Sequence, residues 1–304
     1  HELKKSNFKV KVCVTAQHRE MLDQVLNFFE IVPEYDLDLM SPNQTLNGLS
    51  ATILSKMDEV LVAERPNLVL IHGDTTTSSM VALAAFHLGI SIGHVEAGLR
   101  TYNKKSPFPE EINRQLTGKL SDIHFTPTSH ATQNLLREGV FQQNIIETGN
   151  TVIDALFWTI NKIEQPNYIH PEIENLKNTI PTHKKIILVT GHRRENFGEG
   201  FKDLCESLIE ISEKEDVTIV YPVHLNPNVK KMVYDLLSEK KDIYLIPPVS
   251  YPAFVWLMKQ SFLILTDSGG IQEEAPSLGK SVIVTRIISE RPEGVAAGHS
   301  ILVG

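Results

Sequence analysis

The stretch Asp267-Ser268-Gly269-Gly270 has the residue types of a phosphate-binding turn. It lies between an apolar run at 262–265, which predicts a buried strand, and a segment at 272–278, which predicts a helix. Two adjacent glycines let a ligand approach the backbone, and the free N–H groups at a helix start favour an anion. Glu274, one turn into that helix, could accept hydrogen bonds from a sugar diol. The alternative is a tight turn in which Ser268 only caps the helix.

Acidic residues follow predicted strands in the first half of the chain. Asp74 comes just after the apolar run at 67–71, Glu96 follows the run at 90–95, and Glu110-Glu111 begins a predicted helix. Clustered carboxylates can divide into acid and base roles, because proximity and burial separate their pKa values. The alternatives are an Asx turn or helix cap at Asp74, and for Glu110-Glu111 the ordinary preference for acids in a first helical turn.

Cationic and donor side chains cluster mainly in the second half. They are His192, Arg193, Arg194, His224, Arg286 and Arg291. Arginine binds phosphate or carboxylate through two parallel hydrogen bonds, although ordinary salt bridges are the alternative for any single one. His192 follows a predicted strand and is a candidate proton donor or ligand contact. No zinc-helix, cysteine-pair or G-x-S-x-G spacing occurs, so we expect no metal site and no serine hydrolase.

Strand and helix patterns alternate along the chain, which predicts an α/β fold with parallel sheets. The stretch 165–183 contains several prolines and little periodicity, so we expect domains at 1–165 and 166–304 with a ligand cleft between them. Residues 1–5 resemble the last turn of a helix, and 301–304 an apolar strand. We therefore expect a first strand and loop before residue 1 and further helices after residue 304.

Composition limits the partners of the protein. The 304 residues are 41% hydrophobic and 22% charged, with a formal charge of −8. The sequence pI is about 5.9. This acidic balance argues against nucleic-acid binding, which needs a basic face. No apolar run approaches the ~18 residues of a membrane span and no signal peptide is visible, so we expect no membrane association and a cytoplasmic location.

Several multi-residue motifs occur in order along nearly the whole chain. They are His72-Gly73-Asp74-Thr75-Thr76, His94-Val95-Glu96-Ala97-Gly98-Leu99-Arg100-Thr101, Pro107-Phe108-Pro109-Glu110-Glu111, Thr148-Gly149-Asn150-Thr151, Gly191-His192-Arg193-Arg194-Glu195-Asn196, Pro222-Val223-His224-Leu225-Asn226-Pro227 and Asp267-Ser268-Gly269-Gly270-Ile271-Gln272-Glu273-Glu274. Together they closely resemble the bacterial non-hydrolysing UDP-N-acetylglucosamine 2-epimerases.

The resemblance implies a GT-B fold, in which two Rossmann-like domains hold a nucleotide sugar between them. It implies reversible conversion of UDP-N-acetylglucosamine to UDP-N-acetylmannosamine, by elimination of UDP to a bound 2-acetamidoglucal and re-addition of UDP. No cofactor is needed. The family also suggests a homodimer and a role in supplying precursor for cell-surface polysaccharide. A hydrolysing 2-epimerase and a GT-B glycosyltransferase are the alternative activities.

The resemblance also assigns roles to individual residues. The implied catalytic residues are Asp74, Glu96, Glu110 and His192. The implied substrate contacts are Ser268, Gly269, Gly270, Glu274, Arg291 and Phe254, with backbone near Val249 as an alternative flank for the uracil. A second, regulatory UDP-N-acetylglucosamine site would use Gln17, Arg193 and His224. The chain departs from the family pattern at Glu20, where some members have glutamine, and at Ile287-Ile288, where Asp-Thr is usual.

Overall fold

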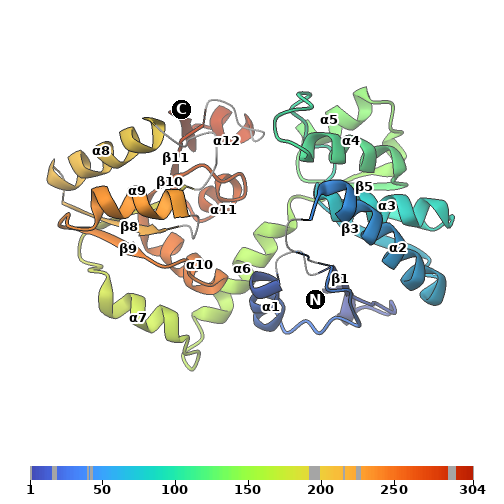
Figure 1. Cartoon of the computed structure of the whole chain (residues 1–304), viewed down its shortest axis with the longest axis horizontal. Coiled ribbons are helices and arrows are strands. Elements are labelled where there is room, and N and C mark those ends of the chain that lie inside the picture. The colour runs from blue at the N-terminus through green and yellow to red at the C-terminus, as the bar shows by residue number, and fades with distance from the viewer. Residues whose placement is uncertain are drawn as a thin grey trace. The chain divides into compact units, whose positions relative to one another are not determined.

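The chain folds into two compact units, His1–Thr151 and Val152–Gly304. The computed structural model (Figure 1) describes residues 2–15, 19–39, 41, 44–191, 199–214, 216–223, 227–286 and 292–303. The division falls earlier in the chain than the boundary expected near residue 165, because helix α6 (Thr151–Ile163) packs with the second unit. The stretch expected to be an irregular linker contains a helix, α7 (Pro171–Thr179), which has proline at its first position.

The first unit is built on parallel strands. Its strands are β1 (Cys13–Val14), β2 (Tyr35–Asp36), β3 (Leu68–His72), β4 (Ser91–Val95), β5 (Ile123–Thr126) and β6 (Ile145–Glu147). Its helices are η1 (Glu2–Lys5), α1 (Arg19–Phe28), α2 (Leu46–Glu64), α3 (Thr76–His87), α4 (Glu110–Leu120), α5 (Ser129–Arg137) and η2 (Gln142–Asn144). β1 pairs with β2, and the other strands form a four-stranded sheet in the order β3-β4-β5-β6.

Local sequence explains how the longest helix of this unit forms and packs. The Thr45 hydroxyl accepts a hydrogen bond from the N–H of Gly48 and so caps the start of α2. Leu49, Ile53 and Met57, spaced four residues apart, are all buried. This stripe packs with α3, β3 and β4 in one apolar cluster. The cluster supports the strands that end in His72 and Val95.

The second unit contains a six-stranded sheet. Its strands are β7 (Lys185–Thr190), β8 (Val217–Pro222), β9 (Ile243–Ile246), β10 (Ser261–Thr266), β11 (Ser281–Val284) and β12 (Ser300–Leu302). Its helices besides α6 and α7 are α8 (Glu199–Lys214), α9 (Pro227–Leu237), α10 (Tyr251–Gln260), α11 (Ile271–Ser277) and α12 (Pro292–Ala296). The sheet order is β12-β11-β10-β7-β8-β9 and every pairing is parallel.

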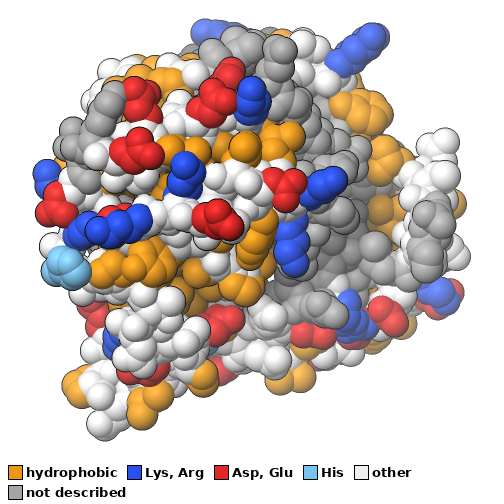
Figure 2. Space-filling view, turned by 60° about the vertical axis from the view of Figure 1, so that its left-hand side comes forward, with side chains coloured by type: hydrophobic (Ala, Val, Ile, Leu, Met, Phe, Trp, Pro, Cys, Tyr) orange, Lys and Arg blue, Asp and Glu red, His pale blue; other side chains and the backbone are white. Residues whose placement is uncertain are grey.

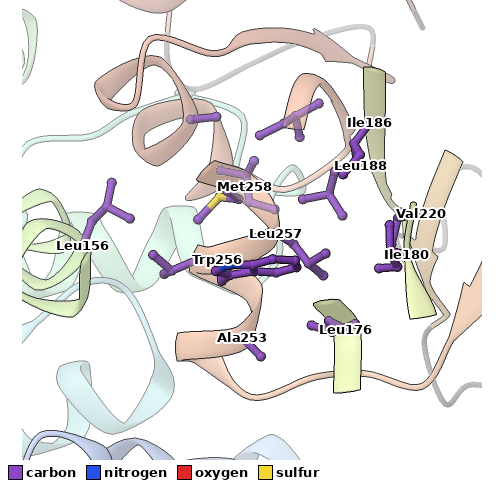
Figure 3. Close-up of a cluster of buried hydrophobic side chains, with 14 of the residues drawn as sticks. Leu156, Leu176, Ile180, Ile186, Leu188, Val220, Ala253, Trp256, Leu257 and Met258 are labelled. Atoms are coloured by element: carbon purple, nitrogen blue, oxygen red, sulfur yellow. The ribbon is translucent and has the colours of Figure 1, made fainter. Parts of the chain in front are cut away.

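Alternate residues of β7 point to opposite faces of this sheet. Ile186 and Leu188 belong to a buried cluster with α6, α7, α10 and α11, whereas Ile187 and Val189 belong to a cluster with α8 and α9. Figure 3 shows the first cluster, in which Trp256 of α10 lies among side chains from the strands and helices. Helices thus cover both faces, as a parallel sheet requires.

The strand order reverses between β7 and β10. The chain runs outward from β7 through β8 to β9, then returns to β10 on the other side of β7 and continues to β12. In open α/β sheets, ligands bind outside the carboxyl ends of the strands at such a reversal. Thr190 and Thr266 are register partners there, so the carboxyl ends of β7 and β10 lie side by side.

Charges of both signs are mixed on the face drawn in Figure 2, where Lys and Arg side chains alternate with Asp and Glu. The described side chains on this face therefore form no extended basic patch of the kind that binds nucleic acid. Among the helices in the described part of the chain, none combines the length and apolar character needed to cross a bilayer.

Candidate functional site

The carboxyl end of β3 carries Asp74 on a turn that is held from several sides. Gly73 has φ +69, a conformation that glycine adopts readily, and its N–H donates to the carbonyl oxygen of Val95 at 3.0 Å. Nε2 of the buried His94 lies 2.8 Å from the carbonyl oxygen of Gly73 and must donate to it. Because both contacts come from β4, the position of Asp74 depends on the neighbouring strand.

His94 holds this turn as an uncharged ring. Burial is the main cause that lowers its pKa to about 4, against the smaller opposing effect of the hydrogen bond to Gly73. The ring is therefore neutral near pH 7, with its proton on Nε2. His94 contributes geometry here and adds no positive charge to the carboxylates nearby.

Helix α4 fixes Asp74 from the other side. Nδ2 of Asn113 donates to the backbone carbonyl oxygen of Asp74 at 2.9 Å. Nη2 of Arg114 lies 2.5 Å from Oδ2 of Asp74. Asn113 and Arg114 are buried, with exposed fractions of 8% and 5%. The ion pair with Arg114 and the hydrogen bond from Asn113 therefore fix both the carboxylate and the backbone of Asp74.

Glu96 occupies a strained position at the end of β4. Its φ is +65, which is costly for a residue with a Cβ, and residues strained in this way tend to cluster at functional sites. Oε1 lies 3.5 Å from Nδ2 of Asn150, and Oε2 lies 3.9 Å from Nε2 of His72. A Cβ at Gly73 would lie only 3.2 Å from Oε2 of Glu96. The carboxylate of Glu96 therefore packs against the turn that carries Asp74.

The neighbouring acids Glu110 and Glu111 have different surroundings. Glu111 is fully buried, and its carboxylate accepts the backbone N–H groups of Thr101 at 2.8 Å and Tyr102 at 3.1 Å. It holds the loop after β4 in place, which is a structural role. Glu110, the first residue of α4, is half-buried, and within the described part of the chain its side chain makes no hydrogen bond. Glu110 thus remains available to a ligand.

In the second unit, the predicted phosphate-binding turn follows β10 at the reversal of strand order. The hydroxyl groups of Thr190 and Thr266 lie 2.6 Å apart and join the ends of β7 and β10. The N–H of Ser268 donates to Oγ1 of Thr266 at 3.0 Å, and Nε2 of Gln272 donates to the Ser268 carbonyl oxygen at 3.1 Å. These bonds orient the Ser268-Gly269-Gly270 turn before any ligand binds.

Neither backbone conformation nor packing requires glycine at position 270. Gly270 has φ −62 and ψ −42, which any residue adopts. A Cβ there would have only an ordinary contact of 3.8 Å with Oε2 of Glu274. The missing side chain therefore leaves space that the protein itself does not use. A ligand that approaches the backbone closely would need that space.

Glu274 is a buried carboxyl group that faces this turn. Only 7% of its surface is exposed, and burial is the main cause that raises its pKa to about 7. The hydroxyl of Tyr251 donates to Oε1 at 2.8 Å, which favours the ionised form, whereas the adjacent Glu273 disfavours it. Glu274 therefore titrates nearer to neutral pH than an ordinary carboxyl group does.

Phe254, one helical turn after Tyr251 in α10, is half-buried and packs against the core cluster of Figure 3. Val249 packs against the same cluster. Both side chains anchor in the core while keeping some exposed surface. Contact of Phe254, or of the backbone near Val249, with the uracil ring stays a prediction.

Other predicted site residues lie outside the described residues. They are Gln17, His192, Arg193, His224 and Arg291, together with Ile287 and Ile288. Among the residues that the structure does describe, no group of three or more His, Cys, Asp or Glu side chains could hold a metal ion.

His94, Asn113 and Arg114 are residues of the site that sequence reasoning missed. Asn113 and Arg114 carried a usable signal, because they lie three and four residues after Glu110 and so share its helix face. His94 gave a weaker signal, since a polar residue inside an apolar strand needs a buried hydrogen-bond partner.

The chain is similar to known proteins over its whole length. A family model described as UDP-N-acetylglucosamine 2-epimerase matches residues 1–304. The UDP-N-acetylglucosamine 2-epimerase of Escherichia coli K12 is 54% identical over 298 residues, 98% of this chain and 79% of that protein. That of Campylobacter jejuni is 54% identical over 304 residues, 99% of this chain and 79% of that protein.

Solved structures agree with this similarity. The Neisseria meningitidis UDP-GlcNAc 2-epimerase bound to UDP-GlcNAc has a TM-score of 0.94 and 52% identity, covering 100% of this chain and 82% of that one. The Methanocaldococcus jannaschii UDP-GlcNAc 2-epimerase in complex with UDP-GlcNAc and UDP has a TM-score of 0.86 and 36% identity, covering 99% of this chain and 83% of that one.

Proposed function

The chain belongs to the UDP-N-acetylglucosamine 2-epimerase family, and on that premise we propose that it interconverts UDP-N-acetylglucosamine and UDP-N-acetylmannosamine. The observation that carries the proposal is the set of carboxylates Asp74, Glu96 and Glu110 at the ends of β3 and β4 and the start of α4. Removal of a proton from carbon needs a fixed base, and its return to the opposite face needs a second group.

The reaction that fits these groups is an elimination followed by an addition. The bond from C1 of the sugar to the β-phosphate oxygen breaks, and its electron pair leaves with UDP. A carboxylate removes the proton from C2, and that C–H electron pair forms the C1–C2 double bond of 2-acetamidoglucal. UDP then adds back to C1 while a proton returns to C2 from the opposite face. No electrons are gained or lost overall, so no redox cofactor is needed.

The second unit is suited to hold the departing UDP. We propose that the Ser268-Gly269-Gly270 turn receives the diphosphate through backbone N–H groups, and that Glu274 accepts hydrogen bonds from the ribose hydroxyls. The ordered turn and the unused space at Gly270 support this assignment. A donor set fixed in advance stabilises the charge that develops on the leaving oxygen. Arg291 and Phe254 remain predicted contacts for the phosphates and the base.

The first unit is suited to move the proton. Asp74, which Arg114 and Asn113 hold in place, is our candidate base. Glu96 and Glu110 are the candidates for stabilising the cationic ring and for returning a proton. His192 remains a predicted member of this group.

We further propose a cytoplasmic homodimer that supplies precursor for cell-surface polysaccharide. The family membership supports this setting. A regulatory UDP-N-acetylglucosamine site at Gln17, Arg193 and His224 also stays a prediction, since these residues lie outside the described ranges.

Proton NMR of the purified protein with UDP-N-acetylglucosamine in D2O tests the activity. We expect deuterium at C2 and a mixture of the two UDP-sugars, because solvent deuterium replaces the proton lost during elimination. A sugar that stays protonated and unconverted would contradict the proposal. Stoichiometric accumulation of UDP with a free sugar would indicate the hydrolysing activity, for which the comparisons offer no support.

Replacement of a glycine tests the phosphate-binding turn. Gly270→Ala should weaken UDP binding by at least about tenfold, roughly 1.4 kcal/mol, because the new methyl group occupies the space needed by the diphosphate. The unfolding midpoint should not fall, since the backbone and the surroundings accept a Cβ. Isothermal titration calorimetry and denaturant unfolding measure the two effects.

The matched control is Gly200→Ala in α8, where a Cβ would meet no atom within 4 Å. It should leave UDP affinity unchanged. Equal affinities for Gly270→Ala and Gly200→Ala would show that the diphosphate does not approach Gly270.

A further inference from the structure

The carboxyl group of Glu274 is held asymmetrically. Oε1 accepts the hydroxyl hydrogen of Tyr251 at 2.8 Å. Oε2 points the other way, because a Cβ built on Gly270 would lie 3.8 Å from it. One carboxylate oxygen is therefore committed to the protein, while the other faces the glycine turn.

Tyr251 is itself firmly placed. It is the first residue of α10, and the preceding Ser250 gives its N–H to Oε2 of Glu172 at 3.0 Å and its hydroxyl to the same oxygen. Burial and the nearby Glu274 raise the pKa of the phenol, so Tyr251 keeps its proton and remains a donor.

We propose that Tyr251 is a positioning residue for nucleotide binding, whose phenol occupies Oε1 of Glu274 and leaves Oε2 to accept hydrogen bonds from the ribose diol of UDP. This inference rests on the proposed function, because it assumes that UDP binds at the Ser268-Gly269-Gly270 turn. The ribose hydroxyls are donors, so they bind the ionised carboxylate better than the neutral acid.

The same bond controls how much of the carboxylate is ionised. In the described part of the chain, the groups that act on Glu274 are Tyr251 of α10 and Glu273 of its own helix. Burial holds the pKa of Glu274 at about 7 even with the phenol bond, which favours the ionised form. Loss of the phenol oxygen should therefore raise this pKa further, and less of Glu274 would be ionised at neutral pH.

The test compares UDP affinity of wild type and Tyr251→Phe by calorimetry from pH 6 to pH 9. Both proteins bind the same UDP, so the ionisation of the nucleotide cancels in the ratio of their affinities. For a rise of about one pKa unit, the variant should bind about tenfold more weakly at pH 6 and nearly as well as wild type at pH 9. Tyr244→Phe, which removes a phenol oxygen from β9, is the control and should give a ratio near one throughout.

Other outcomes would contradict the role of Tyr251, the ribose contact or the proposed function. A ratio that is the same at every pH would overturn the role of Tyr251, because a general loss of packing weakens binding uniformly. In a Glu274→Gln background, Tyr251→Phe should no longer change the pH dependence, and a persistent pH effect would also overturn it. If 2′-deoxy-UDP binds wild type as tightly as UDP does, the ribose contact is wrong. Failure of wild type to bind UDP at any pH would instead contradict the proposed function.

Discussion

Asp74→Asn should lower kcat by about 10³-fold, within the range of effects seen when a positioned general base is lost. The amide keeps the shape of the side chain but cannot take a proton from C2. Its oxygen can still accept from Arg114, and the contacts of Asn113 and His94 with the turn involve backbone oxygens. We therefore expect the turn to keep its conformation while the chemistry is lost.

Rates of deuterium incorporation at C2 and of conversion measure this effect, and calorimetry with UDP measures binding. UDP affinity should stay within about threefold of wild type, because the change removes an interaction with the reacting carbon and not with the nucleotide. Asp58→Asn on the exposed surface of α2 is the control and should leave both rates unchanged. Lost UDP binding in a folded Asp74→Asn protein would move Asp74 from proton transfer to ligand capture.

Gly98→Ala should destabilise the first unit by about 3–5 kcal/mol, from a strained backbone and a steric clash together. Gly98 has φ +89, and a Cβ there would collide with the backbone carbonyl of Ala131, lying 2.8 Å from its carbon. The carbonyl carbon and oxygen of Ala131 cannot move aside easily, because Ala131 lies in α5 and is fully buried. The loop after Glu96 would have to shift away from α5.

The matched control is Gly89→Ala. Gly89 also has a positive φ, +67, but a Cβ there would have no neighbour within 4 Å. Gly89→Ala should lower the free energy of unfolding by only about 1–2 kcal/mol, because it adds backbone strain alone. Urea unfolding, followed by a probe in the first unit, gives both values. Equal losses of unfolding free energy in the two variants would show that the steric clash with Ala131 does not contribute to the effect of Gly98→Ala.

Most secondary structure could be predicted from hydrophobic periodicity. The apolar spacing predicts a helix at 227–237 and a strand at 243–246, and the structure has α9 and β9 at these bounds. The alternating pattern at 9–15 predicts a longer strand than the structure forms, because only Cys13 and Val14 pair with β2. Periodicity reports which face of a segment is apolar, but not whether another strand pairs with it.

The site could be predicted only in part. The apolar runs at 67–71 and 90–95 correctly predicted the strands that Asp74 and Glu96 follow. The partners that hold them are far away in sequence, as Arg114 is from Asp74, and a pattern of local spacing cannot show such contacts. For Glu110 and Glu111 the sequence left the roles open. Burial distinguishes them, because only Glu111 is committed to backbone groups.

The order of strands in the second unit has a consequence for how such a protein can change over time. Because the chain departs from β7 and β10 toward opposite faces of the sheet, this topology favours ligand binding outside the strand ends without any gap in the packed core. Ligand preference can therefore be altered by substitutions in the connecting turns, while the strands and their apolar contacts stay the same. In this unit, different residues determine folding stability and ligand specificity. Selection can therefore change ligand specificity with little effect on stability.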